Sequence, residues 1–243
     1  MFEANIREYL DCNGFEVFCP KAVLFDMDGV LYDSMPNHAV SWHSSMIKFG
    51  LHIQPEEVYT YEGMRGVETI KLLAKREWNK VISDQEAEKI YRAKSFAFNQ
   101  LPPARKMPGV EKLMNKIKYS SLRIGVVTGS GQKSLLDKLD TDFHGLIDKD
   151  IIVTSFDVMH GKPSPEPYIC GLKKAGINPN EGIVIENAPL GVRAAVAAKI
   201  FTIAVNTGSL PDSALLDEGA NIVFSDMEAV SNIWNDLNKN YMI

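Results

Sequence analysis

Short apolar stretches recur along this chain, with segments of helical length between most of them. Each stretch is nearly uniformly apolar and rich in β-branched residues, which is typical of strands covered on both faces of a parallel sheet. The five stretches span residues 22–25, 124–127, 151–153, 183–185 and 202–205. Helices are predicted over residues 110–118, 132–139, 165–175 and 190–199. Strand alternating with helix predicts an α/β core with a doubly wound, Rossmann-like parallel sheet.

The first two stretches are separated by about a hundred residues that contain no convincing strand. This gap is too long for a simple crossover, and apolar positions such as Leu73 and Ile90 recur near helical spacing within it. We predict an inserted helical bundle with helices over residues 38–49, 55–61, 67–78 and 84–100. Pro36 and Pro102 mark the expected connections, because proline stops helices and stiffens linkers.

The first twenty residues precede the first predicted strand. Phe2, Ile6, Tyr9 and Leu10 share a helical face, so we expect a helix that packs on the core or on a partner. The expected division of the chain is an N-terminal extension over 1–20, an α/β core over 21–33 and 104–243, and a helical insert over 34–103.

The charge balance of the chain disfavours two classes of binding partner. The chain has 243 residues with 26 basic and 31 acidic side chains, a net charge of −5, which disfavours binding to nucleic acid or to an anionic membrane through bulk charge. Hydrophobic residues make up 45% and charged residues 23%, as in ordinary globular proteins. We expect no nucleic-acid partner, no membrane partner and a monomer.

The cysteines and the N-terminus predict a cytoplasmic protein. Cys12, Cys19 and Cys170 are odd in number and lack the paired short spacings of a structural zinc site, which favours a reducing compartment. The N-terminus has no apolar signal region, and no uninterrupted apolar stretch approaches 18 residues.

Polar residues follow the ends of the predicted strands, where ligands bind in open α/β sheets. They comprise carboxylates, a hydroxyl beside glycines, a lysine and an amide. This combination is what phosphoryl transfer through an aspartyl phosphate requires. The residues concerned are Asp26, Asp28, Thr128, Lys162, Glu186 and Asn187.

The motifs around these residues occur in a specific order. They are Phe-Asp-Met-Asp-Gly-Val, Val-Val-Thr-Gly-Ser, Gly-Lys-Pro and Glu-Asn. In this order they resemble the haloacid dehalogenase superfamily, over residues 21–32 and 104–226. The helical insert, with Gly-Lys-Pro-x-Pro-x-Pro-Tyr and Glu-Asn-Ala-Pro-x-Gly, looks like the β-phosphoglucomutase subfamily and its helical cap. The resemblance implies a Mg²⁺-dependent phosphatase or phosphomutase.

The resemblance also implies roles for the acidic residues. Asp26 would attack phosphorus, and Asp28 would act as general acid and base. Mg²⁺ would be held by Asp26, by the backbone carbonyl of Asp28, and by Glu186 and Asn187. Relatives more often carry Glu-Asp at the last two positions, so Asn187 supplies an oxygen without a charge. We therefore expect weaker metal binding unless another carboxylate takes part.

The remaining core motifs would bind the transferring group. Lys162 would pair with Asp26 and with phosphate oxygens, and the hydroxyl of Thr128 would bind the phosphoryl group. The amides of Gly129 and Ser130 would add donors, although Thr128 or Ser130 could equally cap the following helix.

The insert carries a loop, Tyr-Glu-Gly-Met-Arg-Gly, which in β-phosphoglucomutases faces the active site with an arginine for a second phosphate. By position that arginine falls on Gly66, and Arg65 is adjacent. Glu62 lies in the same loop. We hypothesise that Glu62 reaches the Mg²⁺ and supplies the missing charge, which would favour a compact substrate such as pyrophosphate. The alternative is an ordinary surface glutamate.

Three further residues match positions that contact substrate in the mutases. His38 matches a histidine near the acid and base aspartate, while Ser34 and Lys94 match a hydroxyl and an amine. His38 and Lys94 favour a mutase that isomerises β-glucose 1-phosphate and glucose 6-phosphate. Glu62, Gly66 and Asn187 favour a hydrolase, which we prefer to the mutase. Its substrate would be a small phosphorylated metabolite, either a sugar phosphate or pyrophosphate.

Asp28 counts against dehalogenation, and a non-enzymatic phospho-acceptor or binding module is the least favoured alternative.

Overall fold

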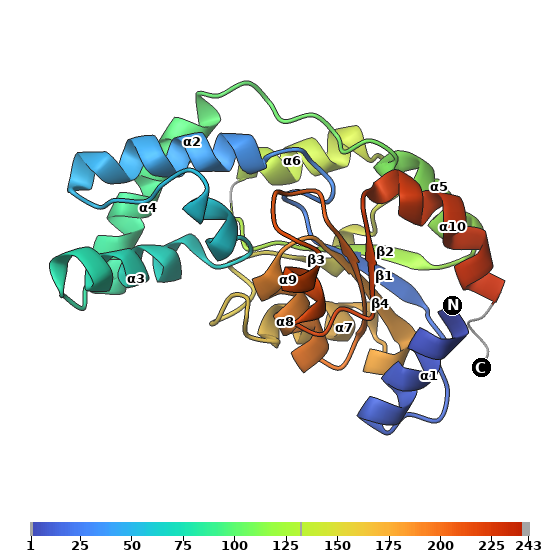
Figure 1. Cartoon of the computed structure of the whole chain (residues 1–243). Coiled ribbons are helices and arrows are strands. Elements are labelled where there is room, and N and C mark those ends of the chain that lie inside the picture. The colour runs from blue at the N-terminus through green and yellow to red at the C-terminus, as the bar shows by residue number, and fades with distance from the viewer. Residues whose placement is uncertain (1, 132, 240–243) are drawn as a thin grey trace.

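Six parallel strands form the central sheet in the order β3-β2-β1-β4-β5-β6 (Figure 1). The structure is a computed structural model that describes residues 2–131 and 133–239. The strands are β1 (Ala22–Phe25), β2 (Arg123–Val127), β3 (Ile152–Val153), β4 (Gly182–Glu186), β5 (Phe201–Val205) and β6 (Ile222–Phe224). This is the predicted doubly wound parallel sheet. The edge strand β6 was absent from the prediction, because its residues are only half-buried and form a short apolar run.

Helices cover both faces of the sheet. On one face α5 and α10 pack on alternate residues of β1, including Val23 and Phe25, while α7 and α8 cover the other face through Ala22 and Leu24. The helices of the core are α5 (Val110–Tyr119), α6 (Lys133–Asp142), α7 (Glu166–Ala175), α8 (Pro189–Ala197), α9 (Ser213–Leu216) and α10 (Met227–Lys239). Two short 3₁₀ helices, η3 (Lys149–Ile151) and η4 (Pro179–Glu181), directly precede β3 and β4. The predicted helix over 132–139 begins at Gln132, which lies outside the described residues.

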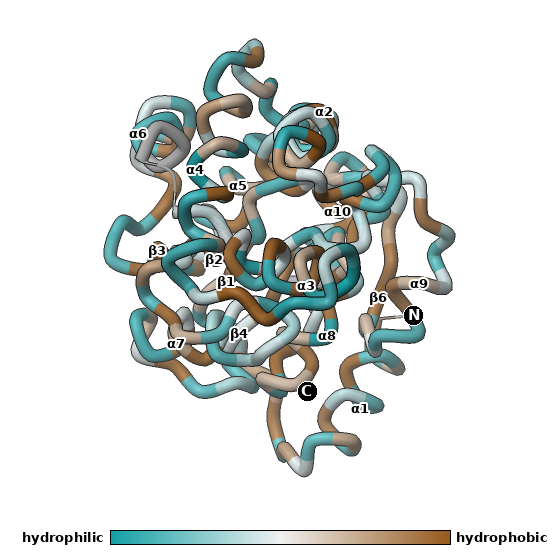
Figure 2. The backbone as a smooth tube through the Cα atoms, turned by 90° about the vertical axis from the view of Figure 1, so that its left-hand side faces the viewer, coloured by the Kyte–Doolittle hydropathy of each residue, from teal (hydrophilic) through white to brown (hydrophobic). Residues whose placement is uncertain are grey.

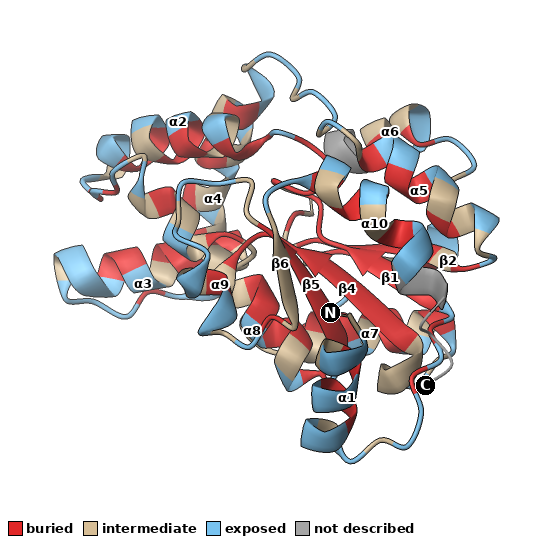
Figure 3. Cartoon of the chain, turned by 45° about the vertical axis from the view of Figure 1, so that its right-hand side comes forward, coloured by how far each residue is buried: buried red, intermediate tan, exposed pale blue. Residues whose placement is uncertain are grey.

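Burial follows from this layered arrangement. The strands β1, β4 and β5 are buried along their whole length, and the helices expose only their outer sides (Figure 3). Hydrophobic segments accordingly gather at the strands, while hydrophilic positions recur along the helices (Figure 2). Burial on both faces explains why the strands read as continuous apolar runs.

The strand order places the candidate chemistry at one point of the sheet. Phe25, the last residue of β1, is paired with Val126 of β2 on one side and with Ile185 of β4 on the other. The chain connections reverse direction between β1 and β4, which is the switch point where ligands bind in doubly wound sheets. The residues that follow β1, β2 and β4 therefore meet at the same edge.

The insert forms a separate helical layer over this edge of the sheet (Figure 1). It contains α2 (Met35–Met46), α3 (Gly66–Trp78) and α4 (Asp84–Asn99), with the 3₁₀ helices η1 (Ile47–Phe49) and η2 (Glu57–Tyr61). These elements have their own apolar core, which includes Trp42, Ile70 and Leu73. The predicted helix over 55–61 is thus the short 3₁₀ helix η2. The exact limits 34–103 for the insert stay a prediction.

The two connections between the insert and the core are hydrogen-bonded to each other. The Asp33 amide donates to the carbonyl of Arg105 at 2.9 Å, and the Met107 amide donates to the carbonyl of Leu31 at 2.9 Å. The two linkers thus form a short antiparallel pair, which limits the directions in which the insert can move relative to the sheet.

The N-terminal extension packs on the core at the end of the sheet opposite the insert. The helix α1 (Phe2–Asn13) buries Ile6, Tyr9 and Leu10 against the main hydrophobic cluster. The Tyr9 hydroxyl donates to the carbonyl of Lys199 at 2.9 Å, and the Tyr9 ring centre lies 5.4 Å from that of Phe201.

Among the described residues, no helix combines the length and the apolar character needed to cross a bilayer. The three cysteines are free thiols.

The packing of α1 predicts the effect of a single substitution. Ile6 has no exposed surface, so Ile6→Ala should lower the free energy of unfolding by about 2–5 kcal/mol, through lost burial and a residual cavity. Urea denaturation measures the difference, with Arg7→Ala on the exposed side of α1 as the matched control. A loss for Ile6→Ala no larger than that of the control would show that α1 does not pack on the core in solution.

Candidate active site

A lysine lies between two buried carboxylates at the switch point of the sheet. The Lys162 ammonium is 2.5 Å from Asp26 Oδ1 and 2.6 Å from Glu186 Oε1, and it also donates to the carbonyl of Val127 at 3.2 Å. All three charged side chains are almost fully buried. Burial raises the pKa of Asp26 to about 7, although the positive charge of Lys162 opposes this shift. The structure therefore brings together three of the predicted residues, from the ends of β1 and β4 and from the loop after β3.

Glu186 is held by protein donors on both of its oxygens. Oε1 accepts from Lys162 and from the Tyr168 hydroxyl at 2.9 Å, and Oε2 accepts from the amides of Asn187 at 2.8 Å and Ala188 at 3.1 Å. These four donors match the four lone pairs of a carboxylate. The predicted role of Glu186 as a direct metal ligand stays a prediction, and the observed contacts give it a separate task, which is to position Lys162.

The helical insert, called the cap from here on, contributes a carboxylate to the cluster of charged residues around Lys162. Glu62 is only 8% exposed, and its Oε1 accepts a hydrogen bond of 2.8 Å from Asn187 Nδ2. Burial and the negative charge of Asp26 raise the pKa of Glu62 well above its usual range. Gly29 makes this contact possible, because a Cβ at position 29 would lie 2.0 Å from Asn187 Nδ2, and its φ of +80° also favours glycine. Glu62 is thus no surface residue.

The charges and oxygens of the cluster fit a divalent cation. Four carboxyl groups, those of Asp26, Asp28, Glu62 and Glu186, lie in the pocket or beside it together with two buried lysines, Lys94 and Lys162, so acidic groups outnumber basic ones by two. The Oδ1 atom of Asn187 is buried and has no hydrogen-bond partner among the described residues. Oxygen donors of this kind are the ligands that Mg²⁺ prefers. Histidine, cysteine and carboxylate side chains alone make no metal-binding group of three or more in the described chain, so the amide and a backbone carbonyl would have to take part.

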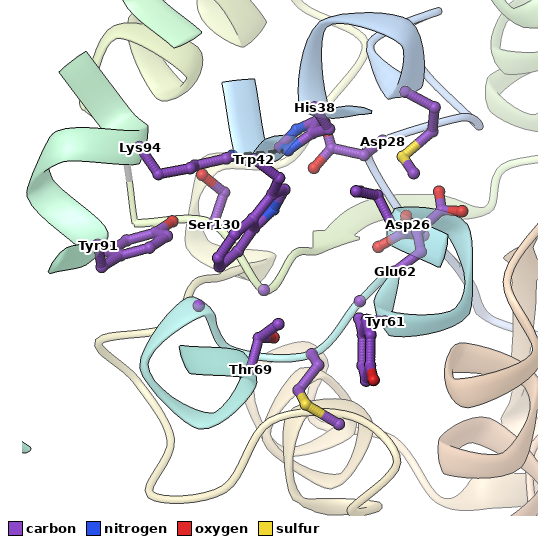
Figure 4. Close-up of a pocket in the computed structure, with 16 residues that line it drawn as sticks. Asp26, Asp28, His38, Trp42, Tyr61, Glu62, Thr69, Tyr91, Lys94 and Ser130 are labelled. Carbon is purple, nitrogen blue, oxygen red and sulfur yellow. Dashed lines mark hydrogen bonds and ion pairs between the residues drawn. The ribbon is translucent and has the colours of Figure 1, made fainter. Parts of the chain in front are cut away.

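A second chain of polar contacts runs from Asp28 into the cap (Figure 4). Asp28 Oδ1 accepts from the Ser34 hydroxyl at 2.6 Å and lies 3.1 Å from His38 Nε2. The other ring nitrogen of His38 is 2.8 Å from Lys94 Nζ. Burial acts to raise the pKa of Asp28, but the charge and the hydrogen bonds of His38 and Ser34 outweigh it and lower the pKa to about 2. His38 and Lys94 line the pocket while Ser34 bonds to Asp28, and the substrate contacts predicted for all three stay predictions.

Lys94 is one of the most deeply buried charged residues, with 1% of its surface exposed. Its ammonium lies 5.4 Å from the ring centre of Trp42, 6.0 Å from that of Tyr91 and 4.8 Å from that of Phe98. Cation–π attraction offsets only part of the desolvation of the charge. Burial accordingly lowers the pKa of Lys94 to about 7, although Asp28 acts in the opposite direction.

The loop after β2 supplies the predicted hydroxyl. Thr128 is buried, and its Oγ1 accepts from the Ser130 amide at 3.0 Å, so the hydroxyl proton is available to another acceptor. The Ser130 amide thus donates to Thr128 within the protein, whereas the sequence predicted that it would bind phosphate directly. Gly129 and Ser130 line the pocket, and a Cβ at position 129 would lie 2.7 Å from the carbonyl oxygen of Gly63 in the cap.

Arg65 is the predicted binding residue that the structure places elsewhere. Its guanidinium donates to the carbonyl of Met159 at 2.5 Å, and Arg65 is not among the residues that line the pocket. The space beside Gly66 is filled by the ring of Tyr91, because a Cβ on Gly66 would lie 2.0 Å from an atom of that ring. The expected place of a phosphate-binding arginine therefore holds an aromatic ring, and the substrate-binding role of Arg65 stays a prediction that these contacts do not support.

The pocket enclosed by these groups is small, with a free volume of about 50 Å³. It is lined by Asp26 and Asp28 of the core, and by Glu62, Lys94 and aromatic residues of the cap (Figure 4). Typical pockets for drug-sized ligands measure about 300–1,000 Å³.

Sequence patterns did not indicate Tyr168, Tyr91 or Trp42 as part of the site. Tyr168 follows Gly-Lys-Pro in the motif, which is the one signal that pointed toward it.

Comparison with known proteins identifies the family. The family model for haloacid dehalogenase-like hydrolases matches residues 23–205. The chain belongs to this family. The match confirms the resemblance seen in the motifs, and it spans β1 to β5 with the whole insert.

Similar haloacid dehalogenase-like proteins include phosphatases and mutases. Hexitol phosphatase A of Escherichia coli is 29% identical over 211 residues, which are 87% of this chain and 93% of that protein. Beta-phosphoglucomutase of Bacillus subtilis is 22% identical over 196 residues, 77% of this chain and 84% of that protein. A structure from Bacteroides vulgatus, provisionally named a beta-phosphoglucomutase, has 50% identity and a TM-score of 0.95 and covers 99% of this chain and 98% of its own. The protein is an enzyme of the phosphatase and phosphomutase type in this family.

The buried lysine of the cap predicts a pH-dependent stability. Because the pKa of Lys94 falls from 10.5 to about 7 on folding, the unfolded chain binds more protons between these values, and stability should rise with pH across this window. Lys94→Met should therefore stabilise the protein by more than about 1 kcal/mol at pH 6.5 and by much less at pH 9.5. Urea denaturation at both pH values measures this, with Lys89→Met on the exposed side of α4 as the control. An equal effect of Lys94→Met at both pH values would contradict the assignment.

Proposed function

We propose that this protein is a Mg²⁺-dependent phosphohydrolase that transfers a phosphoryl group from a small substrate to Asp26 and then to water. The observation that carries the proposal is the Asp26 carboxylate at the switch point, bound by Lys162 on one oxygen and followed two residues later by Asp28. A covalent aspartyl phosphate divides one difficult displacement into two easier steps. The proposal includes a cytoplasmic, monomeric enzyme.

Each residue around Asp26 has a task in these steps. Lys162 keeps Asp26 in place and neutralises charge on the transferring oxygens, while the Thr128 hydroxyl donates to one of them. In the second step Asp28 removes the proton from the attacking water. The His38 and Ser34 contacts hold Asp28 as a carboxylate, which suits that role as a base.

Mg²⁺ would be held by Asp26, by the backbone carbonyl of Asp28, by Glu186 and by Asn187, with Glu62 as the additional carboxylate. When bound, the cation offsets charge on the phosphoryl group and lowers the barrier to attack by an anion. Glu62 lies beside Asn187 in the cluster, and its charge can compensate for the neutral amide. The cap residue thus takes part in assembling the site only when the cap lies against the core.

Three features support hydrolysis of a compact substrate, and inorganic pyrophosphate is the proposed one. Glu62 lies in the cap loop beside Asn187, where its carboxylate would repel the second phosphate of a sugar bisphosphate. Tyr91 occupies the place expected for an arginine at position 66. In addition, a phosphate leaving group needs less help from a general acid than a sugar alkoxide does, which agrees with an Asp28 stabilised in its charged form.

A second candidate is a β-phosphoglucomutase that isomerises β-glucose 1-phosphate and glucose 6-phosphate. The contact between His38 and Lys94, which joins Asp28 to the cap, favours it. Sugar phosphates also remain candidates for hydrolysis, because Hexitol phosphatase A is among the similar proteins.

Phosphate release tests the proposed reaction. We expect Mg²⁺-dependent release from pyrophosphate to exceed release from a panel of sugar phosphates, and Asp26→Asn to lower kcat by at least about a thousandfold because it removes the nucleophile. A colorimetric phosphate assay with and without EDTA measures both. Arg193→Ala, which removes a surface ion pair with Glu218, is the control for handling and folding.

The same enzyme preparation distinguishes the second candidate. β-Glucose 1-phosphate is incubated with and without a sugar bisphosphate activator, and glucose 6-phosphate is followed by a coupled assay. Isomerisation faster than the hydrolysis of any compound in the panel would replace our proposal with the mutase. Full activity of the Asp26→Asn variant would exclude both.

The role of Glu62 gives a separate prediction. Glu62→Gln keeps the size and the hydrogen-bonding oxygen of the side chain but removes its charge, so the Mg²⁺ concentration for half-maximal activity should rise about tenfold or more. Calorimetric titration of the protein with Mg²⁺ should show the same shift without substrate. Glu57→Gln, in the same cap segment, is the matched control. An unchanged Mg²⁺ requirement in Glu62→Gln would remove Glu62 from the metal site.

A further inference from the structure

The cap and the core meet at a second place beside the pocket. The Arg65 guanidinium donates to the carbonyl of Met159 at 2.5 Å, and the Gly161 amide donates to Glu68 Oε2 at 3.2 Å. Arg65 precedes the first residue of α3 and Glu68 lies in its first turn, while Met159 and Gly161 belong to the core loop that leads into Lys162. Both contacts use backbone groups of the core. A third and longer contact joins side chains, since His160 Nδ1 of the same loop lies 3.9 Å from Glu68 Oε1.

Glycine at position 161 allows the two segments to approach closely. A Cβ there would lie 2.5 Å from Arg65 Cγ, 2.8 Å from the Arg65 backbone nitrogen and 3.0 Å from Glu68 Oε2. Contacts below 3.0 Å force one of the two segments to move. Gly161 has no left-handed backbone angle that would require glycine. The space taken by the cap is thus the local reason for a glycine at this position.

This contact is coupled to the site through short stretches of chain. On the core side, Gly161 is bonded directly to Lys162, whose ammonium holds Asp26 and Glu186. On the cap side, only a few residues separate Glu68 from Glu62, which reaches Asn187. Between them, a Cβ on Gly63 would lie 2.8 Å from Lys162 Cδ. The position of the cap segment 62–68 on the core therefore decides whether Glu62 and Lys162 are both in place.

We propose that Arg65 and Glu68 form a latch that holds the cap closed on the loop of Lys162, and that both act as positioning residues. Neither lines the pocket, so neither is a catalytic residue in our assignment. The latch rests on the proposed function, since it serves the same site. It also explains why the guanidinium of Arg65 is directed away from the substrate, where the sequence alone had suggested a binding role.

The latch can be opened from either side. Glu68→Ala removes the acceptor on the cap, and Gly161→Ala introduces a Cβ into the space of Arg65 from the core. Each should lower kcat/KM for phosphate release about tenfold, mainly by raising KM, and should weaken Mg²⁺ binding by a similar factor, because Glu62 is no longer held. Glu68→Gln keeps an acceptor oxygen and should recover most of the loss. The double variant should lose little more than either single variant, since both break the same contact.

A readout without substrate or metal separates the latch from the reaction. Hydrogen exchange of the peptide that contains Met159 to Lys162 should be about tenfold faster in Glu68→Ala than in the parent, because the Gly161 amide loses its acceptor. Two controls should keep the parent values. Arg76→Ala breaks ion pairs that lie within the cap, and Gly208→Ala adds a Cβ whose nearest neighbour is Tyr59 at 3.8 Å.

The outcomes are distinct. Unchanged exchange, Mg²⁺ affinity and kcat/KM in both Glu68→Ala and Gly161→Ala would overturn the latch. Equal losses in Glu68→Gln and Glu68→Ala would also overturn it, since a retained acceptor would then have no effect. A parent enzyme that releases no phosphate from any substrate would instead contradict the proposed function, and the exchange experiment would still decide whether the latch exists.

Discussion

The ammonium of Lys162, buried between Asp26 and Glu186, is the interaction on which the rest of the site depends. Two carboxylates at this depth would repel each other strongly, and a buried charge without a partner costs several kcal/mol. Lys162 offsets part of that repulsion, and Tyr168 with two amides stabilises the remaining oxygens of Glu186. The compensation is incomplete, because Asp28 and Glu62 bring two more carboxyl groups while the cap brings one lysine, Lys94, to the network, and the pKa of Glu62 is accordingly raised. Under the proposed function, a divalent cation would replace the protons that burial otherwise favours on these carboxyl groups.

The position of the cap follows from the same electrostatics. Glu62 enters a negative region, which is unfavourable unless something holds it there. The hydrogen bond from Asn187 contributes, and so does the close backbone approach of Gly63 to Gly129. Glu62 reaches Asn187 across the contact between the cap and the core, so under the proposed function closure of the cap and completion of the metal site would be one event. Such coupling would exclude bulk water from the reacting groups once the cap is closed.

The sequence predicts the core and its chemistry better than the contacts of the cap. Strands buried on both faces give continuous apolar runs, and the residues after them must converge in a parallel sheet, so Asp26, Thr128 and Glu186 could be placed without a structure. The direction of Arg65 could not, because its choice between the pocket and the core loop depends on how the linkers at Asp33 and Met107 orient the cap. Tyr91 was missed for a related reason. Its helical spacing indicates packing within the insert, and only the fold brings its ring against Gly66.

The contacts of Asp28 bear on the choice between hydrolysis and isomerisation. As a general acid, Asp28 would have to hold a proton while Ser34 and His38 both stabilise its charged form. A sugar hydroxyl is a poor leaving group without that proton, so a mutase would need to break these contacts or pass a proton through His38 from Lys94. A phosphate leaves as an anion that is already stable near neutral pH, so cleavage of a phosphoanhydride would not need a proton from Asp28. The contacts of this one carboxylate thus support the proposed phosphoanhydride substrate over a sugar ester.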